Sequence, residues 1–244
     1  MKLRGKKIIV TGGSSGLGYA MAKRFVNEGA SVLISGRNIE NLSKSAAEIG
    51  CKYLQMDIQD ISAHDSFLEK ADQLLDGFNC LVNNAGISLH EKSFFEVTEE
   101  SFRSQVDTNL IGTFFLTQHF AKHLLKKQTE GNILIISSET GITSDIRPYG
   151  YTKAALNSMV EGTAHLFAKQ NIRINAIAPG VTASQLTGRD PNGDISSKNN
   201  MLGRVYMPEE VAEIASFLLS DVSYCLTGQI LVCNNGKTIN SRVK

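Results

Sequence analysis

Residues 11–18 read TGGSSGLG, and this glycine-rich stretch decides the fold. It follows the apolar run KIIV at residues 7–10 and precedes a helix-like amphipathic pattern over residues 19–28. Glycines at these spacings permit a tight turn, a close approach of the backbone to a pyrophosphate, and tight packing of the helix on the sheet. A turn without a ligand is the alternative, but the flanking strand and helix favour a nucleotide site, with predicted contacts from Gly12, Ser14, Ser15, Gly16, Leu17 and Gly18.

Apolar runs and helix-like patterns alternate along the whole chain. Runs such as SVLIS at residue 31 and NILIIS at residue 132 are continuously apolar, as in strands that are covered on both faces. Similar runs begin at residues 51, 79, 172 and 229, and helical patterns cover residues 39–49, 100–127, 149–169 and 209–219. This alternation predicts an α/β fold, with one doubly wound domain over residues 1–244 built on a parallel sheet.

Composition and charge argue against several classes of partner. The 25 Lys and Arg residues nearly balance the 24 Asp and Glu residues, so no global field attracts nucleic acid or an anionic membrane. The apolar run at residues 8–10 is too short for a signal-peptide core or a membrane span, which predicts a soluble, cytoplasmic protein. Four scattered cysteines without a CxxC pair indicate free thiols. His119 and His123 lie four apart on a predicted helix but lack a third ligand, so no metal site is expected.

One segment, residues 182–207, interrupts the alternation of strands and helices. It is polar, rich in Gly, Asn and Ser, and longer than an ordinary connection between elements. Loops of this length are usually lids or disordered linkers. The position of this segment directly after a predicted strand favours a lid over the substrate.

The end of the second predicted strand, SGRN at residues 35–38, indicates which nucleotide binds. An NAD site places a carboxylate at this point to accept hydrogen bonds from the ribose hydroxyls. Gly36 stands in its place, and Arg37 follows with a guanidinium that can bind a 2′-phosphate. NADP(H) is therefore favoured, with NAD(H) as the alternative if Arg37 is only a solvated charge at a helix start.

Together with the glycine-rich loop, several motifs are similar to those of the short-chain dehydrogenase/reductase family. They are NNAG at 83–86, TNL at 108–110, SS at 137–138, YGYTK at 149–153 and APG at 178–180. The resemblance continues to LTGQILV at 226–232 and so covers nearly the whole chain. It implies a single Rossmann domain with seven parallel strands and hydride transfer between a nicotinamide and an alcohol or carbonyl. It also implies a homodimer or homotetramer that pairs through the helices predicted at 100–127 and 149–169.

The resemblance assigns roles to individual residues. Asn109 matches an asparagine that holds a water in a proton relay, and Ser138 matches the serine that hydrogen-bonds the substrate oxygen. The family usually has a threonine contacting the nicotinamide amide, where this chain has Ser184, with Thr182 two residues earlier as the other candidate. The further cofactor-binding positions implied by the family are Asp57, Ile58, Asn83, Ala85, Gly86, Tyr149, Lys153, Pro179 and Gly180.

Two tyrosines compete for the role of catalytic acid. Tyr151 lies thirteen positions after Ser138, the spacing that the family leads us to expect, whereas Tyr149 lies only eleven after it. Lys153 decides between them, because residues four apart share a helix face and residues two apart point to roughly opposite faces. Tyr149 is therefore the predicted acid, and the loop at 139–147 is predicted to be shortened by two residues, since loops tolerate deletions better than helices do.

The chemistry requires a cation beside this tyrosine. A free phenol has a pKa of about 10, so it exchanges protons poorly at neutral pH unless positive charge favours the phenolate. Lys153 and an oxidised nicotinamide are expected to provide that charge, which predicts a lowered pKa for Tyr149. During reduction Tyr149 is then expected to protonate the developing alkoxide while Ser138 donates a hydrogen bond to it.

The substrate class stays open. MLGRVYMPEEVA at 201–212 resembles the matching segment of 3-oxoacyl-carrier-protein reductases, but sugar and polyol dehydrogenases of the family share this sequence pattern. Three hypotheses remain: a reductase of acyl or small-ketone carbonyls, a sugar or polyol dehydrogenase, and a non-catalytic NADP(H)-binding protein. The complete set of Ser138, Tyr149 and Lys153 favours the two enzymes. The tail motif CNNG at 233–236 departs from the family, and catalysis is not expected to depend on it directly.

Overall fold

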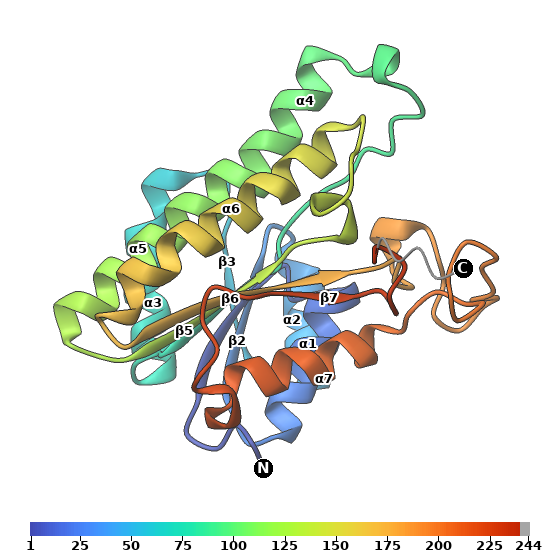
Figure 1. Ribbon diagram of the computed structural model, residues 1–244. Coiled ribbons are helices and arrows are strands. Elements are labelled where there is room, and N and C mark those ends of the chain that lie inside the picture. Colours follow the sequence, from blue (N-terminus) through green and yellow to red (C-terminus); the bar gives the residue numbers. More distant parts are fainter. Residues whose placement is uncertain (240–244) are drawn as a thin grey trace.

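Seven parallel strands form one sheet at the centre of the molecule (Figure 1). The computed structural model describes residues 1–239. The sheet order is β3-β2-β1-β4-β5-β6-β7, which reverses direction between β1 and β4. In such sheets ligands bind in the crevice at the carboxyl ends of the strands, where the order reverses. The strands are β1 (Lys7–Thr11), β2 (Ser31–Gly36), β3 (Lys52–Gln55), β4 (Cys80–Asn83), β5 (Gly131–Ile136), β6 (Ile172–Pro179) and β7 (Ile230–Cys233).

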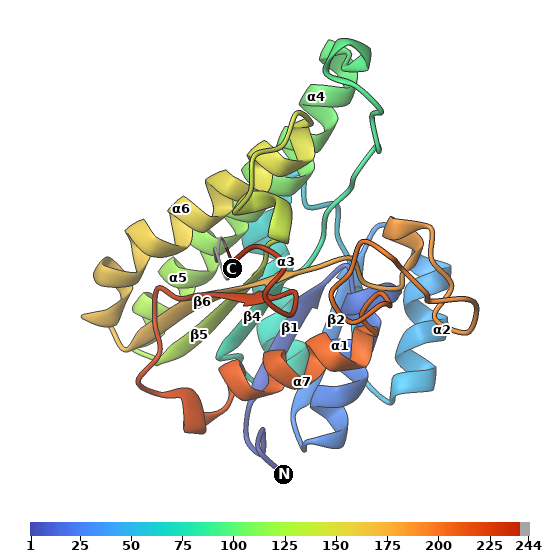
Figure 2. The same ribbon diagram turned by 45° about the vertical axis from the view of Figure 1, so that its right-hand side comes forward.

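Helices cover both faces of the sheet. One face carries α1 (Gly16–Asn27), α2 (Ile39–Ile49) and α7 (Pro208–Leu219). The other carries α3 (His64–Leu75), α5 (Thr113–Lys127) and α6 (Pro148–Ala168). Figure 2 shows α1 and α7 together below the sheet, with α5 and α6 above it. The chain is thus a single doubly wound Rossmann-type α/β domain with seven parallel strands, which confirms the predicted fold class.

Burial on both faces explains why the strand sequences are continuously apolar. Ile9, Leu33 and Ile133 contribute to the core beneath α3, α5 and α6. Ile8 and Leu134, their neighbours in sequence, contribute to the core beneath α1, α2 and α7. Because successive side chains of a strand point to opposite faces, two cores require apolar residues at every position. Each such side chain stabilises the fold by about 1.5–3 kcal/mol when fully buried.

The long helix predicted over residues 100–127 is divided into three parts. α4 (Glu99–Val106) and α5 flank a π-helical segment, η3 (Asp107–Gly112), which contains Asn109. Short π-helical segments of this kind occur frequently at functional sites. Gly112 permits the segment to approach the chain that follows β3, because a Cβ at this position would lie 2.5 Å from the carbonyl oxygen of Ile58.

Helix α3 was not among the helical patterns identified from the sequence. Phe67, Leu68, Ala71 and Leu75 recur at helical spacing and are buried against the sheet. Between them stand charged and polar residues, so that only a narrow apolar stripe marks the helix.

Residues 182–207, which we call the lid segment, form most of the connection from β6 to α7 (Figure 2), and Thr182 and residues 184–187 line the cavity described below. They contain one short 3-10 turn, η5 (Gln185–Thr187), and two isolated bridges. Their two ends meet, because Thr182 pairs with Tyr206 and the amide of Ala183 donates to the Tyr206 carbonyl over 2.8 Å. A Cβ at Gly16 would lie 3.3 Å from the Cβ of Ser184, so the segment borders the glycine-rich loop. Its action as a lid remains a prediction.

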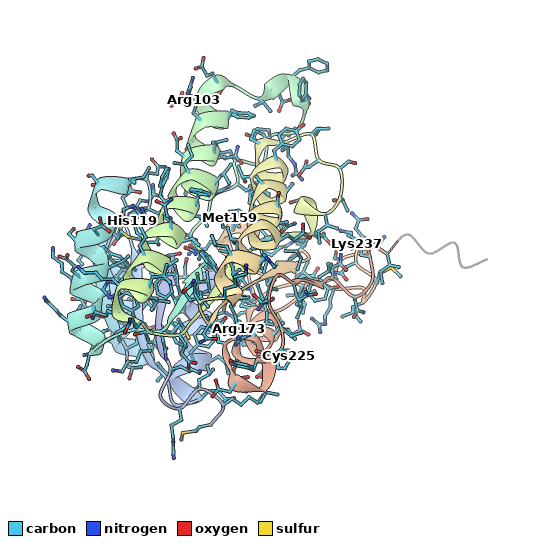
Figure 3. All side chains as sticks on the ribbon, turned by 60° about the vertical axis from the view of Figure 1, so that its left-hand side comes forward. Arg103, His119, Met159, Arg173, Cys225 and Lys237 are labelled. Carbon is cyan, nitrogen blue, oxygen red and sulfur yellow. The ribbon has the colours of Figure 1, made fainter. Side chains whose placement is uncertain are left out.

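Each of the two histidines singled out from the sequence contacts an aspartate. His119 of α5 (Figure 3) pairs with Asp65, and His123 pairs with Asp72, at 2.6 and 3.1 Å. Across residues 1–239, no cluster of three or more His, Cys, Asp or Glu side chains is arranged to hold a metal ion. All four cysteines are free thiols. None of the helices in this described part of the chain is both long and apolar enough to cross a membrane.

We expect Gly112→Ala to destabilise the protein by about 1–3 kcal/mol, because the added methyl group meets the backbone of Ile58. Gly162→Ala is the matched control: it also lies in a helix, no other group lies within 4 Å of its Cβ position, and the change should stabilise by up to about 1 kcal/mol. Urea unfolding followed by circular dichroism measures both variants. Equal stability of the two would contradict the close approach at Gly112.

Candidate active site

A cavity of about 580 Å³ occupies the crevice at the carboxyl ends of the strands. The glycine-rich loop, the ends of the central strands, the start of α6 and the lid segment form its walls. Gly18, Asn83 and Asn109 are not among the residues that line it. The sequence-predicted residues that do line it are Gly12, Ser14, Ser15, Gly16, Leu17, Arg37, Asp57, Ile58, Ala85, Gly86, Ser138, Tyr149, Lys153, Pro179, Gly180 and Thr182, together with Ser184.

The three predicted glycines of the loop act in two ways. Gly12 and Gly16 have φ angles of 64° and 52°, in the left-handed region that glycine adopts without strain. Gly18 acts by packing, because a Cβ there would lie 2.1 Å from the carbonyl oxygen of Gly12. The loop therefore keeps its backbone exposed to the cavity, as a bound pyrophosphate requires.

Asn84 is a site residue that the sequence pattern did not single out. Its Nδ2 donates to the carbonyl oxygens of Thr11 and Gly12 over 3.0 and 3.1 Å, and the residue lines the cavity. The preceding Asn83, which was predicted to line the cofactor, instead donates to the hydroxyl of Thr117 on α5 over 3.0 Å. Successive side chains at a strand end face opposite ways, so only one of the two asparagines can point to the loop.

Arg37 follows β2 and lines the cavity with an exposed side chain. Its carbonyl oxygen accepts a hydrogen bond from Gln55 Nε2 over 2.7 Å, which fixes the backbone. Within residues 1–239 its guanidinium forms no ion pair or hydrogen bond. A Cβ at Gly36 would lie 3.7 Å from Leu42 Cδ2 and 4.0 Å from the hydroxyl of Ser14. A guanidinium without a partner among the described residues, next to a position that lacks a carboxylate, fits a dinucleotide that carries an additional phosphate.

Asn109 is buried behind the cavity wall and holds the segment after β4. Its Oδ1 accepts from the amide of Ile87 over 2.8 Å, and its Nδ2 donates to the Ile87 carbonyl over 2.9 Å. A Cβ at Gly86 would lie 3.2 Å from Asn109 Oδ1 and 3.6 Å from Lys153 Nζ. Asn109 Oδ1 and Lys153 Nζ therefore both lie close to Gly86, which brings the predicted relay residue near the predicted catalytic lysine.

Ser138, Tyr149 and Lys153 converge from β5 and α6. Lys153 is 4% exposed, and its Nζ donates to the Ile136 carbonyl over 2.8 Å. The same Nζ lies 5.5 Å from the centre of the Tyr149 ring. Tyr151 is 46% exposed and is not among the residues that line the cavity. This placement supports the choice of Tyr149 over Tyr151, which was made from helix geometry.

Burial is the largest influence on the pKa values of both Tyr149 and Lys153. It raises the pKa of Tyr149, while a hydrogen bond with Ser138 and the charge of Arg147 act in the lowering direction. Burial also lowers the pKa of Lys153 to about 8. In the protein alone the pKa of Tyr149 is therefore raised, because removal of the phenol from water outweighs the protein groups around it. The lowering expected from an oxidised nicotinamide stays a prediction.

The C-terminal CNNG motif is connected to this site through Glu139, the residue after Ser138. Lys237 (Figure 3) places its Nζ 2.6 Å from Glu139 Oε1, and Asn234 Nδ2 donates to Oε2 over 3.1 Å. Glu139 is buried and lines the cavity. The tail therefore neutralises a buried carboxylate beside Ser138, which is an indirect link to the site; that catalysis does not depend directly on the CNNG motif stays a prediction.

Known proteins resemble this chain along its length. A family model described as "Enoyl-(Acyl carrier protein) reductase" matches residues 12–238. The chain is 33% identical to a 3-oxoacyl-[acyl-carrier-protein] reductase FabG of Aquifex aeolicus, over 97% of this chain and 98% of the relative. It is 30% identical to an L-rhamnose 1-dehydrogenase (NADP(+)) of Thermoplasma acidophilum, over 98% of this chain and 99% of the relative. A solved short-chain type dehydrogenase/reductase from Mycobacterium marinum superimposes with a TM-score of 0.89 at 28% identity, covering 98% of this chain and 97% of that one.

Fold, cavity and sequence similarity agree on the class of protein. The chain belongs to the short-chain dehydrogenase/reductase family. It is an oxidoreductase that acts on CH–OH or C=O groups with a nicotinamide cofactor, NAD(H) or NADP(H). The relatives are named for different substrates, including a 3alpha-hydroxysteroid for a protein of Mediterraneibacter gnavus that is 34% identical over 95% of this chain and 96% of the relative.

We expect Lys153→Met to lower the activity strongly without lowering the stability at pH 7. The folded-state pKa of Lys153, about 8, lies below its ordinary value of 10.5, so the unfolded chain binds more protons between these pH values. Stability of the wild type therefore rises with pH across this window, and below pH 8 the buried charge costs up to about 3 kcal/mol. The variant should be at least as stable as the wild type at pH 7, with a smaller advantage at pH 9.5, and should lose at least about a hundredfold in carbonyl reduction.

Urea unfolding of both proteins at pH 7 and pH 9.5 measures this difference. Ionisable groups other than Lys153 are common to the two proteins, so their titration largely cancels in the comparison. An advantage of the variant that does not change with pH, or a variant that is clearly less stable at pH 7, would contradict a depressed pKa for Lys153.

Proposed function

We propose that this enzyme is an NADP(H)-dependent oxidoreductase that reduces a 3-oxoacyl-type or small ketone carbonyl, or oxidises the matching secondary alcohol. The observation that carries the proposal is the convergence of Ser138, Tyr149 and Lys153 on the cavity that the glycine-rich loop also lines. A carbonyl oxygen can accept hydrogen bonds from both the serine and the tyrosine hydroxyl. The site therefore suits a reaction in which negative charge develops on that oxygen.

Each residue has a proposed role in this reaction. Ser138 donates a hydrogen bond to the substrate oxygen, and Tyr149 delivers the proton. In the reductive direction the phenol gives up its proton, a step that the burial of Tyr149 opposes by raising its pKa. Lys153 and the nicotinamide in its oxidised form are the proposed sources of positive charge that favour the phenolate. Lys153 stabilises the phenolate that remains, and Asn109 is the proposed holder of a relay water. The bound nicotinamide cofactor supplies the hydride.

The preference for NADP(H) is supported by Arg37. Its guanidinium lines the cavity without a partner among the described residues, and Gly36 stands where a carboxylate would repel a 2′-phosphate. The relative from Thermoplasma acidophilum is named as NADP(+)-dependent. NAD(H) remains the alternative cofactor.

Arg37→Ala should weaken NADPH binding by about 10- to 100-fold, as expected for the loss of a charge-assisted hydrogen bond, and leave NADH binding nearly unchanged. Fluorescence titration with each nucleotide gives the two dissociation constants. Arg4→Ala, which removes an exposed arginine near the N-terminus, is the control for net charge. Equal losses for NADPH and NADH in Arg37→Ala, or tighter binding of NADH by the wild type, would contradict the assignment.

A sugar or polyol dehydrogenase is the second candidate. The polar residues His90, Thr140 and Arg147 also line the cavity and suit a hydroxylated substrate. The third hypothesis, a nucleotide-binding protein without turnover, is not retained, because the chain belongs to a family of oxidoreductases and has the complete catalytic set.

The proposal includes a homodimer or homotetramer. α4, α5 and α6 expose apolar side chains that suit pairing with a second copy of the chain, namely Phe102, Phe114, Tyr151 and Leu166. A cytoplasmic location, the absence of nucleic-acid and membrane partners, and closure of the lid segment over a bound substrate stay predictions.

An NADPH-oxidation screen over ketoacyl thioesters, diketones and keto-sugars tests the proposed function. Tyr149→Phe should lower kcat by about 10²- to 10⁴-fold on any active substrate, because the phenol provides the proton. Tyr151→Phe is the matched control and should stay within a few-fold of the wild type, since its ring lies outside the cavity. Turnover by Tyr149→Phe equal to that of the wild type would contradict the assignment of Tyr149 as the catalytic acid.

A further inference from the structure

The shortened loop before α6 places an arginine beside the proposed catalytic acid. Arg147 is the residue before Pro148, with an extended backbone, and stands two residues ahead of Tyr149. Both Arg147 and Tyr149 line the cavity. The charge of Arg147 is also felt at the phenol, whose pKa it acts to lower. Arg147 therefore belongs to the wall of the same cavity as the proposed catalytic tyrosine.

Asp145 fixes this guanidinium from behind. Nε of Arg147 donates to Asp145 Oδ1 over 2.9 Å, and Nη2 donates to Oδ2 over 3.0 Å. Oδ1 also accepts from the amides of Ile146 and Arg147, over 2.8 and 3.2 Å. The Asp145 side chain is only 6% exposed and is not among the residues that line the cavity. A paired, planar contact of this kind sets the orientation of the guanidinium before any substrate binds.

Gly150 makes room for this arrangement. A Cβ at position 150 would lie 2.3 Å from the Cβ of Asp145, so any larger residue between the two tyrosines would displace the carboxylate. The glycine of the PYGY sequence is thus explained by Asp145. The close approach of Gly150 to the Asp145 side chain also positions the first turn of helix α6, which carries Tyr149, against the loop that carries Arg147.

One nitrogen of the guanidinium remains available. Nη1 of Arg147 forms no hydrogen bond within residues 1–239, and the side chain is 31% exposed. Nε and Nη2 are held by Asp145, so Nη1 is the guanidinium nitrogen without a partner among these residues. It carries two N–H groups that can donate to a bound molecule.

The charges around Arg147 favour a neutral group over an anion. Asp145 already compensates the guanidinium, and Glu91 is close enough to act on it electrostatically. Glu91 is held by Gln105, whose Nε2 donates to Glu91 Oε1 over 2.7 Å. Two carboxylates around one guanidinium leave no net positive charge for a substrate carboxylate. They leave a fixed hydrogen-bond donor that suits a hydroxyl oxygen.

We propose that Arg147 is a specificity-determining residue that binds a hydroxyl on the carbon next to the reacting carbonyl, so that the substrate belongs to the hydroxy ketones, as ketoses do. The position follows from the placement of Arg147 next to Tyr149, whose hydroxyl contacts the carbonyl oxygen in the proposed reaction. The inference rests on the proposed function and selects a substrate class within it.

Three ketones of similar size test this inference with NADPH: 3-hydroxybutan-2-one, butan-2-one and 2-oxobutanoate. The wild type should favour the hydroxy ketone over butan-2-one by about tenfold or more in kcat/KM, as expected for one additional hydrogen bond to a fixed charged donor. Arg147→Met should remove most of this preference, and Arg147→Lys should restore only part, because an ammonium cannot form the paired contact with Asp145. Arg103→Met, on the exposed surface of α4 (Figure 3), is the control and should keep the wild-type ratio.

Arg147→Met leaves the buried Asp145 without its cation and can fold poorly, so Asp145→Asn combined with Arg147→Met is the second variant. A preference ratio that is unchanged in the folded variants would overturn the inference, as would a wild-type preference for 2-oxobutanoate. If none of the three ketones is reduced while a ketoacyl thioester is, the inference is wrong and the proposed function stands. If no carbonyl compound is reduced at all, the proposed function is wrong as well.

Discussion

Lys153 carries a positive charge into the interior of the protein, where the carbonyl of Ile136 is the hydrogen-bond acceptor of its ammonium. Glycine at position 141 makes this packing possible, because a Cβ there would lie 2.8 Å from the backbone carbon of Lys153. Helix α6 can therefore approach the segment after β5 closely enough to bring the ammonium to the Ile136 carbonyl, while the four-residue spacing along the helix places Tyr149 beside Lys153. The ionisation of both groups follows from that burial.

This burial links stability to chemistry. A charged amine away from water destabilises the folded state, and the core on both faces of the sheet must offset that cost. Glu139, one residue from Ser138, is a second buried charge, which the tail neutralises through Lys237. Asp145 is a third, and Arg147 neutralises it. Near the catalytic end of the cavity, Glu139 is thus compensated by a distant residue of the tail and Asp145 by an arginine of its own loop, whereas Lys153 has a backbone carbonyl as its partner.

Much of the fold and part of the candidate site could be predicted from local sequence. Continuous apolar runs predicted the parallel sheet, and the four-residue spacing to Lys153 placed Tyr149, rather than Tyr151, at the cavity. What escaped prediction depends on contacts between distant residues: the link from Glu139 to Lys237 spans 98 positions. The rise of the Tyr149 pKa in the protein alone was not foreseen for a related reason, because burial depends on the whole fold. Asn84 was missed although it lies in a motif, since the choice between it and Asn83 depends on strand alternation.

The central claim, that a buried and easily deprotonated lysine organises the site, is tested most directly by the pKa of Lys153 itself. Nuclear magnetic resonance of protein carrying ¹⁵N-labelled lysine side chains can follow each ammonium through a pH titration, with Lys153→Met identifying the signal. The structure predicts a midpoint of about 8. A midpoint at or above about 10, as for an exposed lysine, would contradict it.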